Sequence, residues 1–521
     1  MTQSQILDMS PRSGQTAHVL PLLERHAGLL VAIVTALLCM PFTRSIWMLA
    51  DEGIWLHAAQ RMIDGQILYR DFFEFHPPLG FLTVAAWMAV FGQSLLAARL
   101  LMVLVIAMTA WLAYSCCRMI SNRPGLSALL TLAWAVSVPG LWMQVNHHWF
   151  TSLFSMLTLW AILRADGKPV RLTIAGFAAC AATLVTTHRG GMIAAVGLLS
   201  ILPQRSVKAL VVYIASGLAL VALALAYLWD QGTLMGAFDQ VVLYAIGHYS
   251  GIQGLPYGAF TDVQTIFVVA SFPLTASLLA LLIWRKGTGF LREHHGSTAG
   301  LFALAGFAGC FPRPDAVHIA FCAVLVLPLL AGTLARLLPN SEGGPVLRTI
   351  GLMAVILPLP SIAIAAMQSA SAPRVQTQAG TIGVVPPIGT IAVLDRLDAL
   401  PPDDKIFFYP ADPVLPFLTR RHHPARLDTL VPQYSTPAQY QETCIQLMRD
   451  AQWIVSHFEI TKPDFYRSAF PAMTNPSPHE KIAFEAALKA GFVLDGRYGN
   501  FEILRRGKAS LALCDSIATP D

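Results

Sequence analysis

Long apolar segments recur through the first 367 residues of the chain, and they constrain its fold more than any other feature. A helix needs about 20 apolar residues to cross the hydrocarbon core of a bilayer. Candidate spans lie at residues 27–48, 94–117, 125–143, 149–163, 172–187, 191–203, 209–229, 263–284, 298–312, 316–333 and 347–367. The sequence therefore predicts an α-helical polytopic membrane protein with about 11 transmembrane helices, two of them short.

The composition agrees with a chain that lies mostly in a lipid bilayer. Hydrophobic residues make up 55% of the 521 residues and charged residues only 12%, whereas about a quarter of a soluble domain is charged. The net charge of +5 is modest, and the sequence has no basic patch interleaved with aromatic residues. We therefore expect a lipid environment and no nucleic-acid partner.

The distribution of Lys and Arg predicts the orientation of the spans. Basic residues fall in every second loop: Arg118 and Arg123, Arg164 to Arg171, Arg205 and Lys208, Arg285 to Arg292, and Arg336 and Arg348. Positively charged loops stay on the cytoplasmic side, so residues 1–25 are predicted to be a cytoplasmic tail in the bacterial inner membrane. No small-residue cleavage site follows the first apolar run, which favours an uncleaved span over a signal peptide.

The chain after residue 369 has the pattern of a soluble domain. Residues 370–389 are rich in Pro, Gly and Thr and read as a linker, and 390–521 are predicted to form a small periplasmic α/β domain. We expect strands at 405–409 and 453–456, helices beginning with the caps Thr436 and Ser477, and a final hairpin. Cys444 and Cys514 can pair in an oxidising compartment, but the sequence does not decide whether they do.

Acidic residues gather in the first outer loop, residues 49–93. Residues 1–369 hold 14 acidic residues, and five of these fall within 24 residues: Asp51, Glu52, Asp64, Asp71 and Glu74. A purely structural membrane protein does not need so many acids in one short loop. The clustering therefore indicates a functional site.

This loop resembles the first periplasmic loop of the GT-C membrane glycosyltransferases. The shared pattern is an acidic pair after the first span, then Gly65-x-x-x-Tyr69-x-Asp71, a basic residue before Pro77-Pro78-Leu79, and Arg99 early in the next helix. Within that superfamily it is most similar to bacterial family 39, relatives of protein O-mannosyltransferases and of the aminoarabinose transferase that modifies lipid A. His76 stands where these relatives often have Lys.

The resemblance implies an enzyme that moves a sugar, with inversion, from a polyprenyl-phosphate donor to a periplasmic acceptor such as lipid A, a protein or an envelope glycan. A polyprenyl phosphate leaves readily, so the reaction needs cationic and hydrogen-bonding groups for its developing charge and one base for the acceptor hydroxyl. Asp51 is the expected base and Glu52 a second catalytic acid that orients the acceptor. As structural alternatives, Asp51 caps a helix over 52–64 and Glu52 is a first-turn acid of that helix.

The expected ligands of the donor phosphate are basic residues on the outer side. Arg99 lies inside an apolar segment, where a charge is costly and needs a partner such as the phosphate or a loop carboxylate. The predicted phosphate ligands are Arg99, Arg313, His318, His76 and Arg70, with supporting roles for Tyr69, Asp71, Glu74, Asp315 and His147. Alternatively, Arg70 is a solvated loop charge and Arg313 forms a closed pair with Asp315.

Three further polar segments fall on the predicted outer side: residues 146–149, 187–191 and 311–318. Adjacent histidines point in different directions on a helix, so His147 and His148 alone do not predict a metal site, and a divalent metal is left open. No other cofactor is indicated.

Two other functions compete with glycosyl transfer. A flippase or transporter of lipid-linked saccharides usually has polar groups near the midplane and repeated halves, whereas here the ionisable residues gather at one surface. A ligase of lipid-linked glycans shares the leaving group but uses diphosphate donors. The domain of residues 390–521 is assigned either an acceptor-facing role or that of a structural cap.

Overall fold

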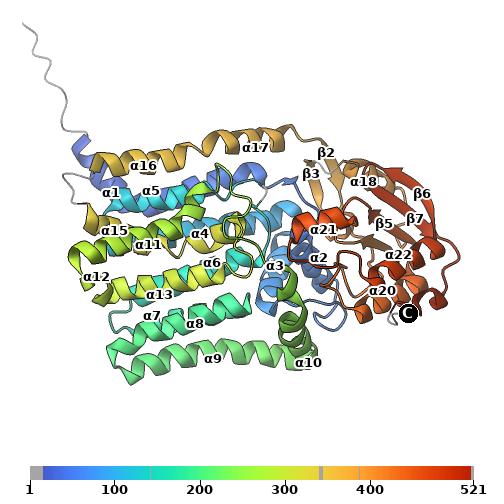
Figure 1. Cartoon of the computed structure of the whole chain (residues 1–521), viewed down its shortest axis with the longest axis horizontal. Helices are drawn as coiled ribbons and strands as arrows, with labels where there is room; N and C mark the ends of the chain where they lie inside the picture. The colour runs from blue at the N-terminus through green and yellow to red at the C-terminus, as the bar shows by residue number, and fades with distance from the viewer. Residues whose placement is uncertain (1–15, 141, 339–343, 386–387, 518–521) are drawn as a thin grey trace, which may run out of the picture.

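The computed structural model describes residues 16–140, 142–338, 344–385 and 388–517. Most of the predicted tail, residues 1–15, lies outside the described residues. A bundle of helices forms one end of the elongated molecule and an α/β domain forms the other (Figure 1). The two parts meet at a layer built from the first outer loop.

Each of the predicted spans forms a helix or a pair of helices. The bundle contains α1 (Thr16–Cys39), α4 (Leu95–Ser121), α5 (Pro124–Ala135), α6 (His147–Leu163), α7 (Pro169–Thr183), α8 (Thr187–Ile201), α9 (Val207–Asp230), α11 (Ile266–Lys286), α13 (His294–Gly309), α14 (Ala316–Ala323), α15 (Leu327–Leu337), α16 (Gly344–Ile356) and α17 (Leu359–Ser371). Shorter connecting elements are α10 (Leu234–Phe238), the π-helix η3 (Asp239–Tyr249) and α12 (Gly289–Arg292).

Among the described helices, four are long and apolar enough to cross a membrane: α4, α9, α11 and the stretch Arg348–Ser371 formed by α16 and α17. The pair α14 and α15, bent by 69°, makes a fifth. The predicted number of 11 spans is therefore not confirmed. Of the remaining predicted spans, those in α1, α5 and α7 are shorter apolar helices of the same bundle.

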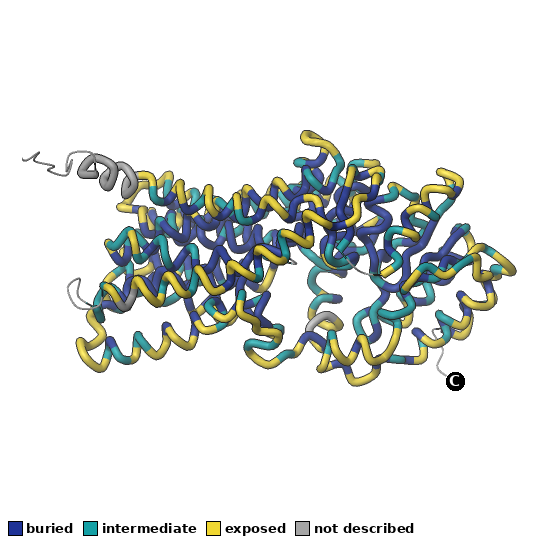
Figure 2. The backbone as a smooth tube through the Cα atoms, turned by 90° about the horizontal axis from the view of Figure 1, so that it is seen from above, coloured by how far each residue is buried: buried dark blue, intermediate teal, exposed yellow. Residues whose placement is uncertain are grey.

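Apolar side chains cover the outside of the bundle as well as its core. On α9, which runs along one edge of the bundle, Leu218, Leu223 and Trp229 are 60%, 66% and 76% exposed. Figure 2 shows exposed positions along the peripheral helices and buried positions between them. Apolar surface of this extent is not tolerated in water, so the chain is a multi-pass membrane protein.

The first outer loop forms two helices, α2 (Asp51–Ile63) and α3 (Pro78–Phe91), joined by an irregular segment. Before them, β1 (Ser45–Ile46) pairs in parallel with β3 (Gly380–Val384), and β3 pairs antiparallel with β2 (Arg374–Thr377). The segment predicted as a linker thus contains a hairpin that is bonded to the end of the first span.

The C-terminal domain is a four-stranded sheet covered by helices. The strand order is β4–β5–β7–β6, with β4 parallel to β5 and the other neighbours antiparallel. Its elements are α18 (Thr390–Asp398), β4 (Ile406–Tyr409), α19 (Val414–Thr419), α20 (Pro437–Asp450), β5 (Trp453–His457), α21 (Pro463–Ala469), α22 (His479–Gly491), β6 (Phe492–Tyr498) and β7 (Phe501–Arg506). The strands, both helices and the hairpin follow the sequence prediction.

The caps of the two long helices differ from each other. Thr436 and Gln439 form the predicted capping box of α20. The prediction for α22 was wrong, because Pro478 rather than Ser477 occupies the N-cap and makes no side-chain cap. A disulfide joins Cys444 at α20 to Cys514, which settles the pairing that the sequence left open.

Candidate active site

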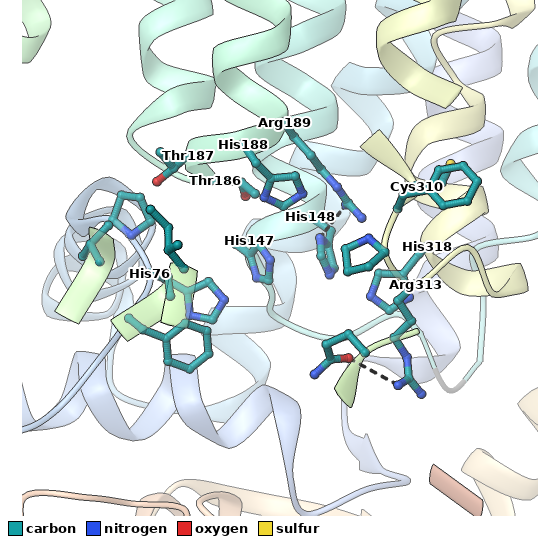
Figure 3. Close-up of a pocket in the computed structure, with 18 of the residues that line it drawn as sticks. His76, His147, His148, Thr186, Thr187, His188, Arg189, Cys310, Arg313 and His318 are labelled. Atoms are coloured by element: carbon teal, nitrogen blue, oxygen red, sulfur yellow. Dashed lines mark hydrogen bonds between the residues drawn. The ribbon is translucent and has the colours of Figure 1, made fainter. Parts of the chain in front are cut away.

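A cavity of about 520 Å³ lies between the bundle and the first outer loop (Figure 3). Its wall comes from four parts of the chain: the loop at residues 75–77, the start of α6, the start of α8, and residues 310–318 before and in α14. Residues 241–246 of η3 add an apolar side. All three polar segments that the sequence placed on the outer side contribute to this one cavity.

Imidazole rings form a row across the cavity. The ring centres of His76 and His147 are 4.4 Å apart, those of His147 and His148 are 3.8 Å apart, and those of His148 and His318 are 4.9 Å apart. His188 lines the wall above the row (Figure 3). The row joins the first outer loop to the segment around Arg313.

Arg189 brings a buried positive charge into the cavity wall. Its side chain is only 6% exposed; its Nε donates to the carbonyl oxygen of Gly309 at 2.6 Å and its Nη1 lies 2.7 Å from Nδ1 of His148. Among the described residues no carboxylate pairs with it. A buried cation without an anion is unfavourable, so this position calls for an anionic ligand.

Arg313, Asp315 and His318 form a second polar group at the same end. Arg313 Nε donates to Asp315 at 2.9 Å, and the Nδ1 of His318 lies 2.7 Å from the other oxygen of that carboxylate. Burial raises the pKa of Asp315, but the hydrogen bonds from His318 and the charge of Arg313 outweigh it and hold the pKa below its usual value. Asp315 therefore orients both side chains, as in the closed pair that the sequence left open for Arg313.

Asp51 is the first residue of α2, and its carboxylate is free of described hydrogen bonds. The N-cap is Ala50, so the structural alternative in which Asp51 caps the helix is wrong. Asp51 is exposed to solvent, and it is not among the residues that line the cavity. The surrounding protein raises the pKa of Asp51, and the nearby charges of His318 and Arg313 act in the opposite direction.

Glu52 and Arg99 form a closed, buried pair. Both are 1% exposed, and the Glu52 carboxylate accepts from Nε of Arg99 at 2.8 Å and from its Nη2 at 2.5 Å. Nη1 of Arg99 donates to the carbonyls of Phe42 and Ser45. Arg99 thus has a loop carboxylate as its partner, the second of the two partners that the sequence left open, but this carboxylate is Glu52 rather than Asp51. Neither Arg99 nor Glu52 lines the cavity.

The same carboxylate positions the cavity wall. Glu52 Oε1 also accepts from the backbone N–H of Val145 at 3.1 Å, two residues before His147. The start of α2, with Asp51, is thereby tied to the start of α6.

The other loop residues stabilise the loop itself. Arg70 is 54% exposed at its side chain and pairs with the neighbouring Asp71, which also accepts from the N–H of Ile67 at 2.7 Å. The hydroxyl of Tyr69 donates to the carbonyl oxygen of His76 at 2.6 Å. Arg70 therefore matches the alternative of a solvated loop charge, and only His76 of these residues lines the cavity.

Glu74 lies behind the cavity wall rather than in it. Its carboxylate is 3.9 Å from Nδ1 of His76, and the residue is 5% exposed. Burial, and then the charge of Asp428, raise the pKa of Glu74 well above its usual range.

The C-terminal domain holds α2 in place. Asp428 of this domain is bound by His57 Nδ1 at 2.7 Å and by Arg61 Nη1 at 2.8 Å, and all three side chains are buried. A Cβ on Gly53 would lie 2.1 Å from the backbone nitrogen of Val414, so α2 and α19 approach at backbone distance. The domain is thus part of the framework that positions Asp51.

The sequence did not indicate two parts of the wall. Residues 241–246 carry no polar signature, and Gln253, which accepts from Arg313 Nη1 at 3.3 Å, lies in an ordinary loop. The sequence placed the segment with Arg189 on the outer side, but it did not show that Arg189 is buried without a carboxylate partner among the described residues. Among the described residues, no three or more His, Cys, Asp and Glu side chains are grouped to hold a metal ion.

Comparisons with known proteins show which fold this chain resembles. Residues 75–229 match the model of a family described as dolichyl-phosphate-mannose-protein mannosyltransferase. No curated protein sequence matches the chain. The structure is similar to that of ArnT from Cupriavidus metallidurans in the apo state, with a TM-score of 0.54 at 15% identity over 97% of this chain and 100% of that chain.

Two further solved structures agree. ArnT from Cupriavidus metallidurans bound to undecaprenyl phosphate has a TM-score of 0.54 at 15% identity, over 98% of this chain and 100% of that chain. The arabinofuranosyltransferase AftD from Mycobacteria has a TM-score of 0.51 at 14% identity, over 93% of this chain and 40% of that chain. The resemblance to GT-C membrane glycosyltransferases that the first outer loop predicted is confirmed.

Proposed function

We propose that this membrane protein of the GT-C glycosyltransferase fold is an inverting enzyme that moves a sugar from a polyprenyl phosphate to an acceptor outside the cytoplasmic membrane. The observation that carries the proposal is Arg189, a buried cation in the wall of a cavity with no carboxylate partner among the described residues. One of the similar structures is described as ArnT bound to undecaprenyl phosphate. A lipid-linked phosphate supplies the anion that Arg189 lacks.

The reaction is a displacement at the anomeric carbon. The acceptor oxygen forms a bond to that carbon on the face opposite the phosphate, and the bond from the carbon to the phosphate oxygen breaks with its electron pair. Arg189 and the pair of Arg313 and His318 stabilise the charge that develops on the phosphate. No acid is needed for this leaving group.

Asp51 takes the proton of the acceptor hydroxyl as its oxygen attacks. A hydroxyl is far less acidic than an ordinary carboxylic acid, so the proton is transferred while the new bond forms. The raised pKa of Asp51 makes it a stronger base. Its exposure leaves the carboxylate accessible to an acceptor that arrives from the aqueous side.

The acceptor lies on the side of the α/β domain, which we propose to be periplasmic. In the bundle, α12 with the basic residues beside it stands at the end opposite to the sheet (Figure 1), as the alternation of basic loops requires. The disulfide between Cys444 and Cys514 fits an oxidising compartment. Lipid A, a protein or another envelope glycan are the acceptor classes within reach there.

The test uses the purified full-length protein, a panel of polyprenyl-phosphate sugars and an envelope extract as acceptor. We expect extract-dependent release of polyprenyl phosphate that falls at least about 100-fold in Asp51→Asn. Asp64→Asn is the matched control, because it removes an exposed carboxylate at the other end of α2. Full activity in Asp51→Asn would refute the role of Asp51, and no release from any donor would refute the proposed function.

The phosphate site has a separate readout. Arg189→Met should abolish measurable binding of sugar-free polyprenyl phosphate, and Arg189→Lys should restore part of it because the charge is kept without the forked geometry. Unchanged binding in Arg189→Met would show that the phosphate lies elsewhere.

A further inference from the structure

The cavity wall distinguishes between charged and uncharged sugars, and this inference rests on the proposed donor site. Among the described residues, the lining contains two arginines and five histidines but no aspartate or glutamate. The chemistry of the wall therefore differs from that of a site built for a cationic group, which would present a carboxylate.

The positive charge of the wall balances one negative charge. Arg313 is already neutralised by Asp315, and its other two nitrogens donate to Gln253 and to the carbonyl oxygen of Ala469. Arg189 alone has no carboxylate partner among the described residues. A phosphodiester between a sugar and a polyprenol carries a single negative charge, which Arg189 compensates, so no cation is left for a second anion.

The part of the cavity beyond Arg189 is lined by neutral hydrogen-bonding groups. Burial, and then the charge of His188, lower the pKa of His76 to about 3, so this imidazole is uncharged at neutral pH. Within the described chain, the Nδ1 atoms of His76 and His147 are buried and have no hydrogen-bond partner. A neutral imidazole donates through one nitrogen and accepts through the other, and a sugar hydroxyl can do both in return.

The carboxylate behind the ring of His76 does not change this conclusion. Glu74 lies behind the ring of His76, at 3.9 Å from Nδ1, and does not line the cavity. Burial also raises its pKa, which weakens it as a source of negative charge for an ammonium group.

We infer that the sugar of the donor is an uncharged polyhydroxy sugar, without an ammonium or carboxylate group, and that His76 and His147 bind its hydroxyls. Nη1 of Arg189, the proposed phosphate ligand, lies 2.7 Å from Nδ1 of His148, and His147 is the next residue in the row, so sugar and phosphate occupy adjacent parts of one cavity. The imidazole row is then the specificity-determining surface of the donor site.

The experiment compares donors that share one polyprenyl phosphate and differ in charge. The neutral set carries mannosyl, glucosyl, galactosyl or arabinofuranosyl groups; one donor carries an amino-deoxy pentose and another a uronic acid. Binding to the purified full-length protein is measured by competition, independently of turnover. We expect at least one neutral donor to bind on the order of 100-fold more tightly than both charged donors, since an unmatched charge costs several kcal/mol in such a site.

Two variants separate sugar binding from phosphate binding. His147→Asn should weaken binding of the preferred neutral donor about 10-fold and leave sugar-free polyprenyl phosphate unaffected. His295→Asn is the matched control, because His295 lies in α13 outside the cavity and should change neither. If His147→Asn weakened binding of the neutral donor and of sugar-free polyprenyl phosphate equally, His147 would not belong to a separate sugar-binding part of the cavity.

The outcomes for the inference and for the proposed function are distinct. If the amino or the uronic donor binds as tightly as the best neutral one, the inference is wrong; loss of amino-donor binding in Glu74→Gln would then identify the missing carboxylate. If neutral donors bind most tightly but release no polyprenyl phosphate in the presence of acceptor, the inference stands for the ligand and the proposed transferase activity fails.

Discussion

Replacement of Arg99 by methionine tests whether the charge inside the first predicted apolar helix after the loop serves catalysis or folding. The structure pairs Arg99 with Glu52, and both are 1% exposed. Removing the arginine leaves a buried carboxylate that retains only the N–H of Val145 as a partner. Breaking a buried ion pair in this way costs about 3–5 kcal/mol.

The expected loss of stability is large enough to measure in detergent. At roughly 2 °C per kcal/mol for a large chain, the apparent unfolding temperature of Arg99→Met should fall by roughly 6–10 °C. The double variant Glu52→Gln/Arg99→Met should recover much of this loss, because no unpaired charge remains. Arg70→Met is the control, since its exposed pair with Asp71 contributes less than about 1 kcal/mol.

The same measurement can refute the structural assignment. If Arg99→Met unfolds at the wild-type temperature and binds sugar-free polyprenyl phosphate at least about 10-fold more weakly, Arg99 contacts the donor and its pairing with Glu52 is not its function. Wild-type affinity in the fraction that remains folded would support the pairing.

Four other changes test the framework around the site. Asp428→Asn should lower stability by about 3 kcal/mol, because the buried His57 and Arg61 lose their anion, and thermal unfolding measures it. Gly53→Ala should cost about 1–3 kcal/mol and reduce turnover more than donor binding, since its Cβ meets the backbone of α19. Reduction of the disulfide of Cys444, which spans 70 residues, should destabilise the domain by about 4 kcal/mol. The kcat/KM of wild type should fall as the pH drops through the pKa of Asp51. Because this pKa is raised, the acid limb of the profile should lie above about pH 4. A flat profile down to pH 4 would exclude Asp51 as base.

Local patterns in the sequence predicted the helices of the bundle and most of the outer domain. Apolar length determines where a helix can lie in lipid, and the capping box at Thr436 with Gln439 determines where α20 begins. The motif from Asp51 to Arg99 indicated the resemblance to GT-C membrane glycosyltransferases. These features depend on residues close together in the chain, so they can be read without a structure.

The partners of charged residues could not be read in this way. The sequence placed Arg99 beside either phosphate or a loop carboxylate such as Asp51, and the structure pairs it with the adjacent Glu52, leaving Asp51 free. The two carboxylates are neighbours in the chain but point in different directions on a helix. Only the packing of α2 against α4 decides which of them is buried.

The cavity and its charge balance are likewise products of the tertiary structure. The sequence by itself determined a polytopic helical chain with polar segments on one side, because hydropathy and loop charge act locally. Only the fold brought His76, His147, His188, Arg189 and Arg313 into one wall and left Arg189 without a carboxylate among the described residues. The reason is physical: whether a buried charge needs a counter-ion depends on every group around it in space, and the groups named here come from segments up to 237 residues apart.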